Sequence, residues 1–465
     1  MDPKTTYSCV DDSRLLINHS MLDDNIPPLK KKTRYSSSLV AYDYDNIPAD
    51  IILNILMELP AKSLLRFRCV SKDWRCIIED PHFVYMYGLR SRHRRGGLKF
   101  LAMQNKKRSR KRGNHQNDQH FLLVDQEGNK TEVPHPMDGQ TLTYDSYSQA
   151  GVEGIICLDN MIWNPTIRKK FDLPPQCPNM SFIRSGSNEP EIENIYYLGF
   201  DSPTQQYKVL SICVGCPKES ELGNRYSQGG LFLQGMFQMQ VITIEGTKSS
   251  WRDITHHIPE KEMKDMTLIG YSTNLYLKDE IYIVVGYPEH LALMVFSVGQ
   301  ETFRFIHLPE EITHAESKFW NLIEVRECVA LIKMNNDEIA DATGTEIWRL
   351  INTNTSSIHN NAPAAKEDWE KIIYSTWPIY LYHPKISNPE LEREPVVLCA
   401  INSTQNLVET LDETATKFYY SYWDITQGNM KKARKLQKIL GYYSIISKHV
   451  ETLFDPTSPK SWAKV

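Results

Sequence analysis

Residues 47–83 read IPADIILNILMELPAKSLLRFRCVSKDWRCIIEDPHF, and this stretch predicts three short helices. Pro48 suits the first turn of a helix, and Pro60 ends that helix because proline lacks a backbone N–H. Large apolar residues recur between them at helical spacing, namely Ile51, Ile52, Ile55, Leu56 and Leu59. Three helices of this size carry more apolar surface than they can bury among themselves, so we expect a partner to cover part of it.

Two more helices complete this unit. The second is expected to open at Ser63, or at Ala61-Lys62 just before it, and to carry Leu64, Leu65 and Phe67. Ser71 is placed to cap the third helix, which carries Trp74, Ile77 and Ile78. Pro81 is expected to stop the third helix.

At these residues the chain resembles the F-box, the adaptor-binding module of Skp-cullin-F-box ubiquitin ligases. The motif runs through LPAKSLL at 59–65, RCVSKDWR at 68–75 and DPHF at 80–83. The resemblance implies binding to a Skp adaptor and, through it, to a cullin. It also implies that the adaptor is contacted by Pro48, Ile52, Leu56, Leu59, Pro60, Leu64, Leu65 and Val70. The alternative, an ordinary three-helix packing unit, does not account for the order of these motifs.

Composition sets limits on the class of protein. The 465 residues have room for one large domain and a small one, or for about three average domains. The chain has 53 basic and 57 acidic residues, a net charge of −4, so its overall charge favours neither nucleic acid nor membranes. We see no signal peptide and no long apolar run, and therefore expect a protein of the nucleus, the cytoplasm or both, with no membrane partner.

The nine cysteines, an odd number, fit a reducing compartment without disulfides. Residues 1–44 are polar and irregular, and we expect a disordered leader there. The F-box is expected over 45–87 and a basic linker or loop over 88–115. Within this linker a nuclear-localisation signal is a candidate role for Lys106, Lys107, Arg108, Arg110, Lys111 and Arg112. A solvated loop and a nucleic-acid-binding arm remain alternatives, although a nucleic-acid partner is not expected.

From about residue 98 the helical period disappears, and short strand-like runs separated by turn residues take over. Leu-Pro or Ile-Pro exits end at residues 174, 259 and 309, which lie 85 and 50 residues apart. These intervals suit a repeat of about 40 to 50 residues, and they predict a mostly β fold, a β-propeller of about six blades over 98–458. The strand-like Tyr442–Ser447 near the end is expected to pair with an early strand and close the ring.

A second resemblance covers roughly residues 150–455, which look like the F-box-associated domain of plant F-box proteins. The motifs that carry it are GIICL at 154–158, WNPTIRK at 163–169, GFDSP at 199–203, YKV at 207–209, SWR at 250–252 and FRFIHLP at 303–309. That family implies a kelch-like propeller that holds the degradation target. The sequence departs from the family pattern at Ser297 and at Lys278-Asp279-Glu280, which leaves the blade boundaries open.

Motifs for catalysis are weak. Cys213 and Cys216 have the spacing of half a zinc site, but no second pair follows, and His256-His257 is an isolated pair. We therefore expect no metal, no cofactor and no catalytic residue in a non-catalytic ligase subunit that recognises an unidentified target protein. The alternatives are a propeller enzyme with a polar, metal-bearing site at the channel mouth and a nuclear RNA-binding protein that uses residues 106–112.

Overall fold

The structure is a computed structural model, and it describes most of the chain from Ala49 to Ser458. The described residues are 49–94, 98–106, 118–136, 151–158, 160–176, 191–216, 232–234, 236–246, 248–269, 274–312, 320–333, 345–351, 369–374, 396–400, 405–411, 418–424, 429–432, 434–435 and 444–458. The leader expected over 1–44 lies outside these residues, and so does Pro48.

Four helices form the N-terminal unit: α1 (Ala49–Glu58), α2 (Ala61–Phe67), α3 (Lys72–Ile78) and α4 (Pro81–His93). The Ser71 hydroxyl accepts a hydrogen bond from the Trp74 backbone N–H at 3.2 Å, which confirms Ser71 as the cap of the third helix. The rings of Phe67 and Trp74 meet edge to face with centroids 5.4 Å apart, and this contact ties α2 to α3.

The sequence does not predict α4, because Pro81 reads as a helix stop. Proline suits the first turn of a new helix equally well, and Asp80 caps α4 by accepting the Phe83 backbone N–H at 3.1 Å. Helix α4 runs to His93, and strand β1 (Leu98–Lys106) follows shortly after it. The span 88–115, predicted as a linker, is thus helix up to residue 93 and strand over 98–106.

Beyond α4 the described elements are strands, apart from the short helices η5 (Thr255–His257) and α6 (Glu260–Met263). The strands pair antiparallel into six sheets. The first two are β25 (Ser444–Val450), β1, β2 (Asp118–Asp125) and β3 (Lys130–Val133), then β4 (Ile156–Leu158), β5 (Met161–Asn164) and β6 (Lys169–Asp172). The third is β11 (Trp251–Asp253), β10 (Met236–Thr243), β8 (Gln206–Cys216) and β7 (Glu191–Asp201).

The fourth sheet is the largest. One of its strands comes from the chain segment that joins β8 to β10 of the third sheet. It contains β16 (Thr302–His307), β15 (Leu291–Ser297), β14 (Glu280–Gly286), β12 (Thr267–Ile269), β9 (Phe232–Gln234) and, beside β14, β13 (Asn274–Leu277). The fifth is β17 (Trp320–Val325), β18 (Cys328–Lys333), β19 (Thr345–Leu350) and β20 (Trp369–Tyr374). The sixth is β21 (Val396–Ala400), β22 (Gln405–Leu411), β23 (Phe418–Asp424) and β24 (Asn429–Lys432).

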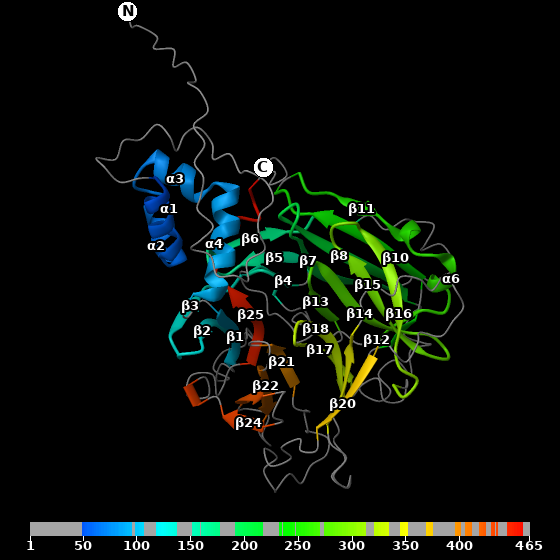
Figure 1. Ribbon diagram of the computed structural model, residues 1–465. Coiled ribbons are helices and arrows are strands. Elements are labelled where there is room, and N and C mark those ends of the chain that lie inside the picture. Colours follow the sequence, from blue (N-terminus) through cyan, green and yellow to red (C-terminus); the bar gives the residue numbers. More distant parts are fainter. Residues whose placement is uncertain are drawn as a thin grey trace, which may run out of the picture.

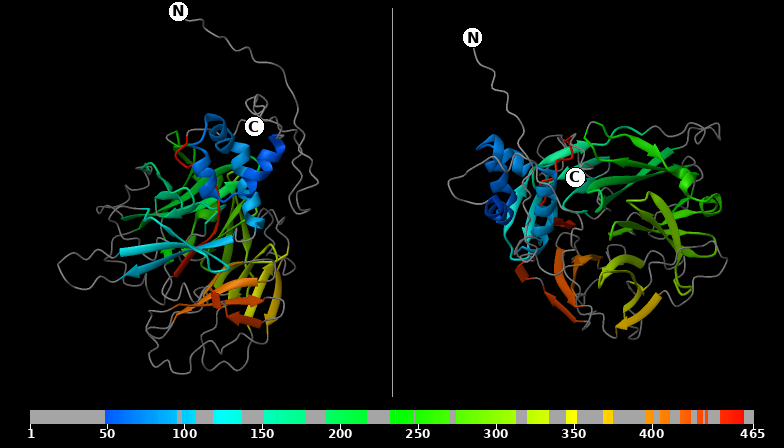
Figure 2. Two further views of the ribbon diagram at one scale, coloured as in Figure 1. Left: turned by 90° about the vertical axis from the view of Figure 1, so that its left-hand side faces the viewer. Right: turned by 45° about the horizontal axis from the view of Figure 1, so that its top comes forward.

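These sheets follow one another around a ring, coloured from cyan through green and yellow to orange in Figure 2. The mostly β propeller that the sequence predicts is confirmed. The blade number needs one refinement: five of the six described sheets have four or more strands and count as full blades, while the sheet of β4, β5 and β6 has three.

The ring closes by pairing the last strand with the first. Strand β25 runs antiparallel to β1, with Val450 opposite Leu98 and Ser444 opposite Met103, and the red strand lies beside β1 in Figure 1. This confirms the predicted closure over the described part of that stretch, Ser444–Ser447, while Tyr442 and Tyr443 lie outside the described residues. Closure gives the edge of β1 a partner and removes an aggregation-prone open edge.

The turn at Lys278-Asp279 shows how the sequence departs from the family pattern without changing the fold. Both residues have positive φ, 51° and 63°, and they join β13 to β14 as a two-residue hairpin turn of the kind that favours Asn-Gly. The Asp279 carboxylate accepts hydrogen bonds from the Ser202 hydroxyl at 2.7 Å and from the Tyr276 hydroxyl at 3.1 Å. These bonds hold the turn in place of a glycine.

One hydrophobic core spans the helical unit and the ring. Leu56, Leu64 and Tyr87 of the helices belong to the same buried cluster as Ile155 and Leu453 of the propeller. Helix α4 contacts both β1 and β25, so it lies over the seam where the ring closes (Figure 1). The helical unit is therefore packed onto the propeller.

Candidate protein-binding face and its anchorage

Three large apolar side chains of the helical unit are exposed: Ile51 (46%), Ile55 (53%) and Val70 (68%). We call the side of α1 that carries the first two the apolar face. Ile51 and Ile55 lie four residues apart on α1 and so share one side of that helix. In the part of the chain that the structure describes, the other exposed large apolar residue is Ile351 of the propeller. Such a concentration on one small unit is typical of a protein-binding surface.

The residues that the resemblance assigns to the adaptor fall into three groups. Pro60 and Val70 are exposed, and the half-buried members are Ile52, Leu59 and Leu65, which pack against the core. Leu56 and Leu64 are fully buried, at 0% exposure, and they hold the helices together. The side chains of these two residues face inward, and their contact with a partner stays a prediction.

The difference in exposure along α1 has a simple geometric cause. The apolar residues of α1 form two neighbouring rows, one through Ile51 and Ile55 and one through Ile52 and Leu56. Hydrophobic spacing alone does not say which row faces the core. Packing of α1 against the other helices buries the second row, so Ile51 and Ile55, which the sequence did not single out as site residues, are the exposed ones.

The exposed charges of α2 and α3 are mainly positive. Lys62, Arg66, Lys72 and Arg75 are exposed on these helices, while Glu79 is half-buried and pairs with Arg75 at 3.0 Å. On α1, exposed Glu58 is already paired with Arg90 of α4 at 2.5 Å. A surface that combines exposed apolar residues with positive charge suits a partner with an acidic surface.

Beneath the helical unit lies Glu451, the residue directly after β25, with 11% of its side chain exposed. Its Oε2 accepts hydrogen bonds from the Ala61 backbone N–H at 3.2 Å, the Tyr87 hydroxyl at 3.0 Å and Arg94 at 2.9 Å. Its Oε1 pairs with Lys99 of β1. Burial raises the pKa of this carboxyl, but Lys99, the Ala61 N–H and Arg94 outweigh it and lower the pKa to about 2.

The turn at Asn164-Pro165-Thr166 also holds the segment after β25. The Asn164 amide donates to the backbone carbonyls of Thr452 at 3.1 Å and Phe454 at 2.8 Å, and its Oδ1 accepts the Thr166 N–H at 2.9 Å. His449 is fully buried, and its Nε2 lies 2.8 Å from the Thr166 hydroxyl. The Asn164-Pro165-Thr166 motif thus forms the predicted turn and also holds the end of β25, the strand that closes the ring.

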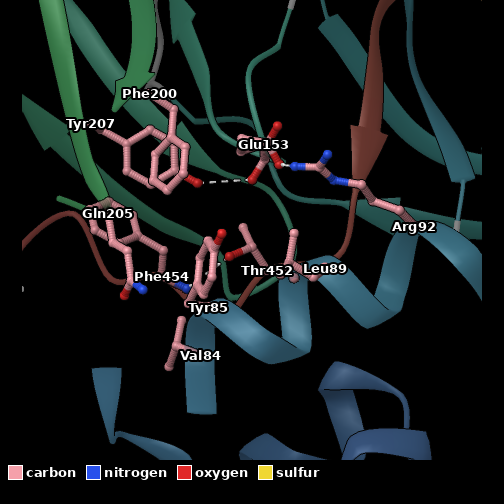
Figure 3. A pocket seen from close by; sticks show the side chains of 11 residues that line it. Val84, Tyr85, Leu89, Arg92, Glu153, Phe200, Gln205, Tyr207, Thr452 and Phe454 are labelled. Carbon is pink, nitrogen blue, oxygen red and sulfur yellow. Dashed lines mark hydrogen bonds and ion pairs between the residues drawn. The ribbon is translucent and has the colours of Figure 1, made fainter. Parts of the chain in front are cut away.

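A cleft lies between α4 and the ring, and its lining is drawn in Figure 3. Tyr85 of α4 stacks on Phe200 with ring centroids 6.4 Å apart, and Arg92 of α4 pairs with Glu153 of the ring. The cleft is open to solvent, and the cavity within it has a volume of about 30 Å³. That is room for about two water molecules, so the cleft is a packed seam between helix and ring.

Two of the candidate metal and redox residues, Cys213 and His257, have described surroundings that do not suggest such a role. Burial raises the pKa of the Cys213 thiol to about 11, so this cysteine is protonated at neutral pH. His257 instead lies with its Nδ1 2.6 Å from the Glu301 carbonyl oxygen. Among the described residues, no group of three or more His, Cys, Asp or Glu side chains is placed to hold a metal ion.

Two further expectations concern nuclear import and membrane association. Lys106 is the last residue of β1, and the remaining members of the nuclear-localisation candidate lie outside the described residues, namely Lys107, Arg108, Arg110, Lys111 and Arg112. Its role in nuclear import stays a prediction. Of the helices that the structure describes, none is long and apolar enough to span a membrane.

Comparison with known proteins agrees with this architecture. The family model described as F-box associated beta propeller domain matches residues 100–439, and the one described as F-box domain matches residues 45–85. An F-box protein of Arabidopsis thaliana is 28% identical over 333 residues, which cover 69% of this chain and 72% of the relative. A second Arabidopsis F-box protein is 24% identical over 400 residues, with 84% and 92% covered, and an F-box/LRR-repeat protein of the same plant is 23% identical over 431 residues, with 87% and 84% covered. The chain therefore belongs to the F-box proteins that carry an F-box associated beta propeller domain.

Proposed function

We propose that this chain is the target-recognition subunit of a Skp-cullin-F-box E3 ubiquitin ligase. The apolar face of the F-box binds the Skp adaptor, and the propeller binds a target protein. Ubiquitin transfer takes place on other subunits, and this chain contributes by raising the effective concentration of the target near the charged ubiquitin carrier. Exposure of Ile51, Ile55 and Val70 on a unit that is otherwise well packed is the observation that carries the proposal.

The adaptor contact can be tested on exposed residues without disturbing the core. We expect the double variant Ile51→Asp/Ile55→Asp to fold, because both side chains are about half exposed. Each large apolar anchor of an interface commonly contributes about 2 kcal/mol, so the two together should weaken adaptor binding by about a thousandfold. Calorimetry with the purified full chain and a purified Skp adaptor measures the effect.

Ile351→Asp is the matched control, since Ile351 is 56% exposed and lies in the propeller after β19. This variant should bind the adaptor with wild-type affinity. Equal affinity of the wild type and the double variant would show that the adaptor does not use the apolar face. A wild-type chain that fails to bind any Skp adaptor would overturn the proposed ligase role.

A further inference from the structure

One carboxylate bonds to both the F-box and the ring. Glu451 accepts the first backbone N–H of α2, from Ala61, and hydrogen bonds from Tyr87 of α4 and from Arg94. It also pairs with Lys99 of β1, the strand that closes the ring. Glu451 itself follows β25, the other strand of that closure. Four segments of the chain are thus fixed to a single side chain.

The chemistry of these bonds differs from that of the surrounding core. Leu453 and Phe454 hold the helices onto the ring through apolar contacts, which are non-directional. Hydrogen bonds to an ionised carboxylate are roughly twice as strong as neutral ones and are directional. Because Glu451 is buried and ionised, its bonds to Ala61 and Arg94 set the orientation of α2 and α4.

We propose that Glu451 is a positioning residue that fixes the orientation of the F-box on the propeller. A target held by the propeller then lies at a constant distance and direction from the adaptor. The inference rests on the proposed function, because this orientation matters only if ubiquitin crosses from the adaptor side to a propeller-bound target. Small misplacements of reacting groups are costly for such transfer.

A matched pair of variants isolates this role in the full chain. Glu451→Gln removes the charge at the seam. Glu301→Gln removes a comparable carboxylate within the ring, where Lys208 at 2.8 Å and Arg252 at 2.6 Å pair with it. Both carboxyls have a pKa lowered to about 2, and their side chains are 11% and 14% exposed, so each variant should lose stability. Only the first should loosen the F-box.

Hydrogen exchange followed by mass spectrometry reports the loosening. In Glu451→Gln we expect amides of residues 59–67 and 81–94 to exchange about tenfold faster, because the bonds that anchor these helices are lost. In Glu301→Gln the increase should stay within β8, β10 and β11. Should Glu451→Gln not fold, Arg94→Gln is the substitute: it removes the bond from Arg94 to Glu451, together with the Arg94 bonds to the Glu58 and Leu59 carbonyls and to the Tyr87 hydroxyl, and leaves the Lys99 pair intact. Exchange should change in the same direction.

Ubiquitin transfer reports the consequence for geometry. In a ligase reconstituted from purified adaptor, cullin, RING subunit, ubiquitin-activating and ubiquitin-conjugating enzymes and ubiquitin, this chain's own lysines serve as the probe. Wild type and Glu301→Gln should be modified at the same narrow set of lysines, and Glu451→Gln at a broader set with adaptor affinity unchanged. An unchanged set of lysines or unchanged exchange would overturn the positioning role. Failure of the wild type to bind the adaptor would instead overturn the proposed function.

Discussion

At the scale of single residues, burial separates apolar side chains that look alike in the sequence. Leu64 is fully buried among the helices and Ile55 is half exposed. We expect Leu64→Ala to lower the free energy of unfolding by about 2 to 5 kcal/mol, because it leaves a cavity. Ile55→Ala should change it by less than about 0.5 kcal/mol. Urea unfolding of the two variants measures the difference, and equal losses would contradict the assignment of Leu64 to the core.

His449 predicts how stability depends on pH. Burial, with Lys99 nearby and against the opposing effect of Glu451, lowers the pKa of His449 to about 3 from 6.5. Below about pH 6.5 the unfolded chain therefore binds a proton at His449 that the folded chain does not bind. The stability that neutral His449 contributes above pH 6.5 is lost as the pH falls towards 3. One such group lowers the free energy of unfolding by about 2 kcal/mol between pH 8 and pH 5.

The control for this prediction is His449→Gln, measured by urea unfolding at each pH. The variant should show a shallower loss of stability than the wild type between pH 8 and pH 5, whatever its stability at pH 8. Glu451, with its pKa lowered to about 2, adds a loss in the same direction only below pH 4.5. Parallel curves for the two chains above pH 5 would show that His449 is not held neutral by the fold.

At the scale of elements, neighbouring residues predict most of the helices, strands and turns. The remaining features depend on contacts between segments that are distant in the sequence. Ser71 as a helix cap, the strands and the turn after Asn164 follow from neighbouring residues, and the structure confirms them. Helix α4 could not be inferred, because Pro81 either ends a helix or begins one. The Glu451 bonds join residues up to 390 positions apart, a separation that no local pattern reveals.

The turn between β13 and β14 carries a prediction of its own. Both Lys278 and Asp279 have positive φ, but only the Asp279 side chain accepts hydrogen bonds, from Ser202 and Tyr276. We expect Asp279→Gly to lower the free energy of unfolding by about 1 to 3 kcal/mol, since it leaves the Ser202 hydroxyl and backbone N–H without their acceptor. Lys278→Gly relieves backbone strain at an exposed site and should leave stability within about 1 kcal/mol of wild type or raise it. Thermal melts compare the two, and an equal response would mean that the carboxylate does not hold the turn.

At the scale of the whole molecule, the F-box and the propeller share a core. The sequence predicts the F-box as a unit of its own over residues 45–87. Since Glu451, Leu453 and Phe454 lie under the helices, we instead expect deletion of residues 444–465 to open the ring and loosen the F-box together. The truncated chain should aggregate and bind the adaptor less well. A truncated chain that stays soluble, melts like the full chain and binds the adaptor normally would contradict both the closure and the shared core.

The central claim is that one chain joins a target to a ubiquitin ligase, and protein turnover in cells tests it most directly. The measurement compares half-lives of the proteins captured by the wild type, by Ile51→Asp/Ile55→Asp and by the control Ile351→Asp. We predict that at least one protein is captured by all three chains, and that its half-life lengthens only with the double variant, which holds the target but cannot reach the adaptor. Identical half-lives of every captured protein with all three chains would contradict the account.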